Sequence, residues 1–240
     1  MKGFYVMTAA LVMILVSLII STARNMSDVA DSSSDGVKET EERLVALTFD
    51  DGPDPEKTTA LLDMLKEKGV SATFFMIGAY VEENAEIVKR MDAEGHQIGV
   101  HTYSHVDLGC LTEAEQREEI EKTRQAIWSV VGERELVVRP PFGRINKVLE
   151  DWIDSPMILW DVDTLDWTGK AAEEIIMETV ESVHDGDIIL MHDISENGLE
   201  GAEGIIDELQ RMGYTFLTID QLFYCKGIEL ENGVTYRYAR

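Results

Sequence analysis

The sequence predicts an α/β fold in which about seven β–α units form a parallel sheet that closes into a barrel. Short apolar runs typical of buried strands alternate along the chain with amphipathic segments typical of helices. This alternation favours parallel strands connected by helices, and seven units approach the eight of the regular barrel. The alternative, an open doubly wound sheet, is disfavoured because no G-x-G-x-x-G motif follows the first strand.

Composition limits the possible partners. The 240 residues are 45% apolar and 28% charged, which suits a single globular domain with a sizeable core. There are 46 acidic residues and 21 Lys and Arg residues, so the formal net charge is −25. This charge argues against nucleic acid as a partner and disfavours binding to an anionic membrane surface. Two cysteines, Cys110 and Cys225, are too few for a disulfide scaffold, and we expect two separate buried thiols rather than a disulfide.

Residues 1–23 are typical of an exported protein. No charge occurs from Phe4 to Ile20, and Lys2 precedes this run. The run is long for the apolar part of a signal peptide and near the lower limit for crossing a bilayer. We favour a membrane anchor over a cleaved signal peptide, and either one exports the rest of the chain. Residues 24–42 lack apolar periodicity and predict a flexible polar linker.

The strands of the predicted domain, residues 43–225, are short and apolar. We expect them at Leu44–Phe49, Ala72–Ile77, His96–Val100, Leu136–Arg139, Met157–Asp161, Asp187–His192 and Tyr214–Ile219. In the tail, residues 226–240, Asn232-Gly233 lies between short alternating runs and predicts a C-terminal hairpin.

The helices between these strands show start and stop signals. Thr112 and Glu115 form a capping box ahead of a long helix that ends at Gly132. The other helices are expected near Glu56–Lys68, Glu83–Glu94, Lys147–Trp152, Ala171–Val183 and Glu200–Met212.

Polar residues gather at the carboxyl ends of the predicted strands. They are Asp50 and Asp51, His101 and His105, Arg139, then Asp161, Asp163 and Asp166, and finally His192 and Asp193. Because active sites of α/β barrels are built at this end of the strands, we expect these side chains to form one site.

Two of these groups indicate a metal. The i, i+4 spacing of His101 and His105 would place both imidazoles on one side of a helical turn. With a carboxylate from Asp50 or Asp51 they would form a two-histidine, one-carboxylate set with an open position, which suits catalytic zinc or another divalent ion. The adjacent carboxylates repel, so a cation would stabilise them, and one is free to accept a proton from the attacking water. The alternative for this pair is a helix N-cap.

Five ordered segments resemble the polysaccharide deacetylases, carbohydrate esterase family 4. They are TFDDGP (Thr48–Pro53), HTYSH (His101–His105), RPPFG (Arg139–Gly143), DTLDW (Asp163–Trp167) and ILMHD (Ile189–Asp193). The resemblance implies a distorted (β/α) barrel and metal-dependent removal of N- or O-acetyl groups from sugars. This sequence departs from the family pattern at Val100, where many members have Asn, and at Phe142, where Tyr is commoner.

The resemblance also implies a role for each residue. Asp50 would be the general base oriented by Arg139, and His192 the general acid held by Asp166. Asp51, His101 and His105 would bind one divalent metal, with Zn²⁺ favoured and Co²⁺, Mn²⁺ or Ni²⁺ as alternatives. The backbone N–H of Phe142 would face the developing oxyanion. Leu190 would line the acetyl-methyl pocket and Trp167 would form one wall of the sugar groove.

The function that we expect is hydrolysis of N-acetyl groups from N-acetylglucosamine units of a cell-wall polysaccharide, with peptidoglycan favoured. The protein would act outside the cytoplasm as a monomer, either secreted or held to the membrane by its N-terminal segment. Four alternatives stay open: an O-acetyl esterase, a chitooligosaccharide deacetylase, a glycosidase with paired carboxylates, and a wall-binding module without activity.

Overall fold

Strand β1 (Arg43–Asp50) lies at the centre of the sheet in the computed structural model, which describes residues 42–240. It pairs in parallel with β6 (Ile188–His192) along one side. On the other side its first half pairs with β7 (Tyr214–Leu217) and its second half with β2 (Thr73–Met76). With β3 (Gln97–Val100) and β5 (Val162–Asp163) at the ends, the order is β3-β2-β1-β6-β5 and every pairing is parallel. The expected α/β fold with a parallel sheet is therefore confirmed.

Two predicted strands differ from expectation. The segment Leu136–Arg139 pairs only at Val138, which bridges Val100 and Met157. Pro140 and Pro141 follow at once, and proline has no N–H to donate to a neighbouring strand. The strand predicted at Met157–Asp161 is shorter and forms β4 (Met157–Ile158). Strand β5 begins at Val162, directly after the end of the predicted strand.

The helices follow their predicted start and stop signals closely. They are α2 (Lys57–Lys68), α3 (Gly78–Val81), α4 (Ala85–Ala93), α5 (Glu113–Val131), α6 (Lys147–Trp152), α7 (Ala172–Ser182), α8 (Gly198–Arg211) and α9 (Ile219–Cys225). The capping box of Thr112 and Glu115 starts α5 as predicted. Helix α3 was not predicted. The predicted strand Tyr214–Ile219 ends earlier than expected, and its last residue begins helix α9. The helix starts there because Thr218 and Gln221 form a second capping box.

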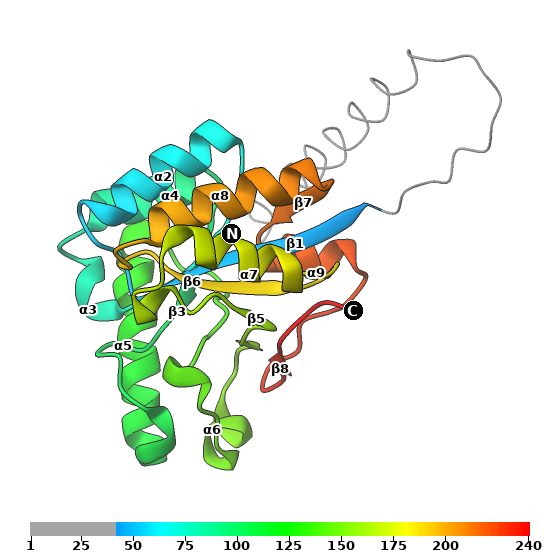
Figure 1. The fold of residues 1–240 in the computed structure, drawn as a ribbon. Coiled ribbons are helices and arrows are strands. Elements are labelled where there is room, and N and C mark those ends of the chain that lie inside the picture. Colours follow the sequence, from blue (N-terminus) through cyan, green and yellow to red (C-terminus); the bar gives the residue numbers. More distant parts are fainter. Residues whose placement is uncertain (1–41) are drawn as a thin grey trace, which may run out of the picture. The chain divides into compact units, whose positions relative to one another are not determined.

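Two hydrophobic cores lie on opposite faces of β1. Val45, Leu47 and Phe49 pack into a core shared with helices such as α2, α5 and α8, and α2, α7 and α8 run along this side of the sheet in Figure 1. Leu44 and Ala46 point the other way, into a core that includes residues of α9. Because side chains alternate along a strand, the next two residues on this second face are Thr48 and Asp50.

The C-terminal tail does not form the expected hairpin. Residues Asn232 and Gly233 do make a turn, in which the Val234 N–H donates to the Glu231 carbonyl at 3.3 Å. The strand that follows, β8 (Thr235–Tyr236), pairs in parallel with β4 instead. The Tyr236 ring packs edge-on against Phe223, with ring centroids 5.0 Å apart. Packing against α9 and β4 thus outweighs the local preference for a hairpin.

Both cysteines are exposed, so the expectation of buried thiols is wrong. Cys110 ends a short 3-10 helix, Leu108–Cys110, and Cys225 ends α9, and both thiols are free. Residues 1–41, which hold the predicted anchor or signal peptide and nearly all of the linker, lie outside the described residues. Between Glu42 and Arg240 no helix is long and apolar enough to cross a membrane.

Candidate active site

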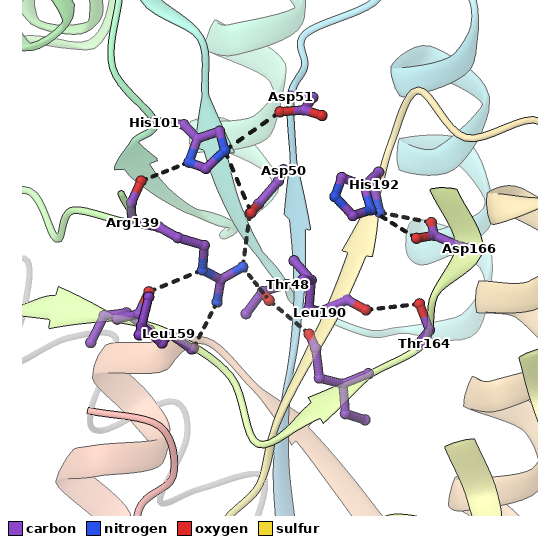
Figure 2. Close-up of polar contacts among 12 residues, drawn as sticks. Thr48, Asp50, Asp51, His101, Arg139, Leu159, Thr164, Asp166, Leu190 and His192 are labelled. Carbon is purple, nitrogen blue, oxygen red and sulfur yellow. Dashed lines mark hydrogen bonds and ion pairs between the residues drawn. The ribbon is translucent and has the colours of Figure 1, made fainter. Parts of the chain in front are cut away.

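The site is built on two neighbouring strands whose residues lie in register. Thr48 pairs with Leu190, and two residues later Asp50 pairs with His192. The period of two puts all four side chains on the same face of the sheet. Figure 2 shows Asp50 and His192 at the ends of β1 and β6, with Asp51 just beyond. The polar residues at these strand ends therefore do come together.

Arg139 is fully buried and binds Asp50. Its Nη1 donates to Asp50 Oδ1 at 2.8 Å and to the Thr48 hydroxyl oxygen at 2.8 Å. Its Nε and Nη2 donate to the carbonyls of Ile158 and Leu159, at 3.0 and 3.1 Å. The guanidinium carbon also lies 4.1 Å from the centre of the Phe75 ring. These hydrogen bonds and the ring contact fix the planar guanidinium group in one orientation. The Asp50 carboxylate bound to it is therefore held firmly.

Asp51, His101 and His105 converge, although their backbone differs from the prediction. One ligand atom from each lies within 4.8 Å of the other two. The segment between the histidines is a loop and not a helical turn, so that part of the prediction is wrong. Thr102 and His105 have left-handed backbone, with φ of 63° and 55°, and Asp51 has φ of 78°. These unusual conformations, which only tertiary contacts can hold in non-glycine residues, bring the imidazoles together.

The donor set fits a divalent cation. Asp51 Oδ1 is buried and has no hydrogen-bond partner among residues 42–240, and it lies 3.5 Å from His101 Nε2 and 3.2 Å from His105 Nε2. His101 Nδ1–H donates to the Arg139 carbonyl at 2.6 Å, which leaves the lone pair of Nε2 facing Asp51. Burial lowers the pKa of His101, which favours the neutral, metal-binding imidazole. A cation between these atoms would satisfy the orphaned carboxylate oxygen.

His192 carries a carboxylate partner. Its Nδ1–H donates to Asp166 Oδ1 at 2.7 Å, and its backbone N–H donates to Asp166 Oδ2 at 2.8 Å (Figure 2). Burial opposes the charged imidazolium, yet the hydrogen bond with Asp166 and the negative charges nearby raise the pKa of His192 to about 9. The imidazolium form is therefore favoured at neutral pH.

The three residues expected to contact substrate lie in different surroundings. Phe142 and Trp167 are exposed, by 58% and 63%. The Phe142 ring packs edge-on against His105 with centroids 4.9 Å apart, and its backbone is left-handed with φ of 61°. Leu190 is only 3% exposed, and its carbonyl accepts from the Thr164 hydroxyl at 2.9 Å.

Sequence reasoning assigned no role to two polar residues of this region. Thr48 accepts from Arg139 and donates its hydroxyl to the Ile189 carbonyl at 2.7 Å, and its i, i+2 spacing from Asp50 was the available signal. Asp193 was noticed but given no role. It is 6% exposed and accepts from the Thr58 hydroxyl, and burial together with nearby carboxylates raises its pKa to about 7. Asp161 and Asp163 do not join the cluster, since Asp161 pairs with Arg240 and Asp163 is exposed.

Two solved structures share the fold of this chain. A T48 deacetylase with substrate is 40% identical, with a TM-score of 0.78 over 84% of this chain and 100% of that one. A family 4 acetyl xylan esterase from Clostridium thermocellum, in complex with a cobalt ion, is 32% identical, with a TM-score of 0.78 over 82% and 98%.

The family model for polysaccharide deacetylase matches residues 37–154. Two relatives are 38% identical: peptidoglycan-N-acetylglucosamine deacetylase PgdA of Listeria monocytogenes over 81% of this chain, and peptidoglycan-N-acetylmuramic acid deacetylase PdaC of Bacillus subtilis over 75%. The chain spans only 41% and 39% of their lengths. A Bacillus cereus peptidoglycan-N-acetylglucosamine deacetylase is 39% identical over 75% of this chain and 68% of its own length. By these matches and by its fold, the chain belongs to the polysaccharide deacetylase family.

Proposed function

We propose that this protein hydrolyses N-acetyl groups of N-acetylglucosamine units in a cell-wall polysaccharide, with peptidoglycan as the polymer. One observation carries the proposal: three metal-ligand atoms within 4.8 Å of one another adjoin a carboxylate fixed by arginine and a histidine fixed by aspartate. Metal-dependent amide hydrolysis uses these three things, namely a Lewis acid, a base and an acid. Relatives named for peptidoglycan deacetylation support the choice of polymer.

Asp51, His101 and His105 would hold the metal. When bound, a divalent ion would polarise the acetyl carbonyl and make a water molecule a better nucleophile. Two imidazoles and one carboxylate with an open position suit Zn²⁺, and Co²⁺, Mn²⁺ and Ni²⁺ are the alternatives. His101 is fixed for this task by the Arg139 carbonyl, while His105 is braced only by the Phe142 ring.

Asp50 would act as the general base. Its Oδ1 is occupied by Arg139, and its Oδ2 lies 3.7 Å from His101 Nε2, on the side of the metal ligands. That second oxygen is the one available to accept a proton from the attacking water. Because Arg139 has four other contacts, the carboxylate keeps this orientation throughout the reaction.

His192 would act as the general acid. An amine is a poor leaving group unless its nitrogen is protonated, and an imidazolium with a pKa of about 9 holds the required proton at neutral pH. Asp166 accepts from Nδ1, so Nε2 is the nitrogen that donates to the leaving amine. Asp50 and His192 end neighbouring strands, which supports a base and an acid that act together on one scissile bond.

Three further residues would contact the substrate. The backbone N–H of Phe142, a residue with a left-handed φ of 61°, would donate to the developing negative charge on the acetyl oxygen. The exposed ring of Trp167 would pack on the apolar face of a sugar ring. Leu190 would form the floor of the acetyl-methyl pocket.

The organisation of the whole chain is also part of the proposal. Residues 43–225 would be the catalytic domain on a distorted barrel of about seven parallel strands, followed by a tail at 226–240. Residues 1–23 would be a membrane anchor or a signal peptide and 24–42 a linker, which puts a monomeric enzyme outside the cytoplasm. The tail's pairing with β4, and the single pairs through Val138, support closure of the sheet.

The test is release of acetate. We expect the metal-loaded protein to release acetate from N-acetylated peptidoglycan, and we expect chelation to abolish this release and added Zn²⁺ or Co²⁺ to restore it. Full activity in metal-free protein would contradict the proposed chemistry. Mass spectrometry of the treated muropeptides locates the acetyl loss on glucosamine, as proposed, or on muramic acid, the sugar named for the Bacillus subtilis relative.

Other outcomes identify the remaining alternatives. Acetate from acetylated xylan but not from peptidoglycan would indicate an O-acetyl esterase, and acetate from short chitin oligomers alone would indicate a chitooligosaccharide deacetylase. Shortened glycan chains without acetate would indicate a glycosidase. Glycan binding without any turnover would indicate a wall-binding module.

A further inference from the structure

The loop between the two histidines needs outside support. Thr102, Tyr103 and Ser104 connect the imidazoles in a segment that is neither helix nor strand. Thr102 is β-branched, and both Thr102 and His105 have positive φ, a conformation that is uncommon outside glycine and strained for a β-branched residue. A loop of this kind keeps its shape only if contacts from elsewhere in the fold hold it.

The carbonyl groups of the loop are bound by the start of α3. The Gly78 N–H donates to the Thr102 carbonyl at 2.9 Å, and the Ala79 N–H donates to the Tyr103 carbonyl at 3.0 Å. A side chain at position 78 would not fit, because a Cβ there would lie 2.8 Å from the Tyr103 ring. These contacts fix one side of the loop backbone.

The amide groups of the loop are bound by one carboxylate. Oε2 of Glu119 accepts from the backbone N–H groups of Tyr103 and Ser104, both at 2.9 Å, and Oε1 accepts from the Ser104 hydroxyl at 2.8 Å. These two amides have no other acceptor within residues 42–240. Hydrogen bonds to an ionised carboxylate are stronger than those between neutral groups.

Helix α5, which carries Glu119, is itself firmly placed. It has 19 residues, starts with a complete capping box, and buries Ile120 in the core. Lys122, one turn further on, puts its ammonium 3.8 Å from the centre of the Tyr103 ring. The helix therefore contacts the loop twice, through a carboxylate and through a cation–π interaction.

We propose that Glu119 is a positioning residue for the metal site: it holds the loop so that His101 and His105 face Asp51. This inference rests on the proposed function, since it assumes that these three residues bind a metal. Glu119 does not reach the metal ligands' donor atoms. It acts through the backbone between them. The competing explanation is that the carbonyl contacts from α3 suffice and that Glu119 contributes to stability alone.

The experiment measures metal affinity in the full chain by competition with a chromophoric chelator, and records the absorption spectrum of the Co²⁺ form. We expect E119A to bind Zn²⁺ and Co²⁺ about 10- to 100-fold more weakly, as is typical when the support of a ligand is lost. We expect E119Q to stay within about threefold, because its amide oxygen can accept from both N–H groups and its NH₂ can donate to the Ser104 hydroxyl. The matched control is E118A, which removes a neighbouring exposed glutamate whose side chain makes no hydrogen bond or ion pair with residues 42–240.

The outcomes separate the inference from the proposed function. Parent affinity in E119A, or an E119Q variant as weak as E119A, would overturn the positioning role. If the unsubstituted protein binds neither metal, the proposed function itself fails. If E119A does not fold, E119D serves instead, because a shorter side chain cannot reach both amides; it is expected to bind several-fold more weakly, and parent affinity in E119D would overturn the inference.

Discussion

The two halves of the candidate site are built on different kinds of backbone. Asp50 and His192, the proposed base and acid, belong to the paired strands β1 and β6 and lie opposite each other in the ladder. Asp51 and His105 lie in loops and Phe142 in a short 3-10 helix, Pro141–Gly143, and all three have left-handed backbone, at φ of 78°, 55° and 61°. Regular hydrogen bonding places the first group, whereas the loop that carries His105 is held by contacts from α3 and α5.

This difference determines which substitutions the site tolerates. A strand residue keeps its position when its side chain is altered, because the ladder is a property of the backbone. A loop residue depends on contacts such as Glu119 with the amides of Tyr103 and Ser104. Substitutions in the strand half should therefore remove chemistry while leaving the fold intact, and substitutions around the loop half should change metal affinity.

The largest effect is expected in the strand half, for D50N. The Asn amide oxygen can still accept from Arg139, but Asn cannot accept a proton from water. We expect kcat/KM to fall about 10²- to 10⁴-fold, the usual contribution of a general base, with bound metal unchanged. Steady-state kinetics together with metal analysis checks this. An unaltered turnover would refute the assignment of Asp50, and loss of the metal would show that the two halves are not separable.

The strand half could be predicted because its signals are local. The apolar run before Asp50 marks β1, the run before His192 marks β6, and parallel strands put their carboxyl ends at the same edge. The capping box at Thr112 gave the start of α5 for the same reason, since all of its partners lie within one turn. The order of the five sequence motifs then indicated which of these residues belong to one site.

The loop half could not be predicted in the same way. The spacing of His101 and His105 suggested a helical turn. The observed loop is instead held by Glu119, which lies 16 residues after Tyr103 and 15 residues after Ser104 in the sequence. Left-handed backbone at Thr102 has no sequence signal, because threonine disfavours it. The hairpin at Asn232 failed for a related reason: packing of Tyr236 on Phe223 overrode a local preference. Contacts distant in sequence decide such segments.

A smaller effect is expected for D166N, which removes the charge beside His192. Without the carboxylate the pKa of His192 falls from about 9 towards its ordinary 6.5. The protonated fraction of His192 at pH 8 would then be much smaller in D166N than in the parent protein. The alkaline limb of the profile of kcat/KM against pH should therefore move to lower pH. An unmoved limb would contradict the assignment of His192 as the acid.

The same substitution has a consequence for stability. The pKa of His192 is higher in the folded state than in the unfolded state, so its contribution is fully present below about pH 6.5 and is lost as the pH rises through about 9. The difference in free energy of unfolding between the parent protein and D166N should therefore be larger at pH 6.5 than above pH 9, which denaturation at several pH values measures. A difference independent of pH would point to lost packing instead.

The smallest effect is expected at the rim of the loop half, for R144A. Arg144 follows the Phe142 loop and pairs with Asp107, just after His105, at 2.5 Å, so the ion pair joins the two loops. Its guanidinium is exposed, and exposed ion pairs contribute little, so we expect kcat/KM to fall at most about threefold. The fall should shrink at high salt, which screens the pair.

R211A, which removes an equally exposed arginine paired with Glu208 on α8, is the control and should leave kcat/KM unchanged. A large loss in R144A that salt does not alter would contradict this expectation and show that Arg144 acts through contacts other than the exposed ion pair.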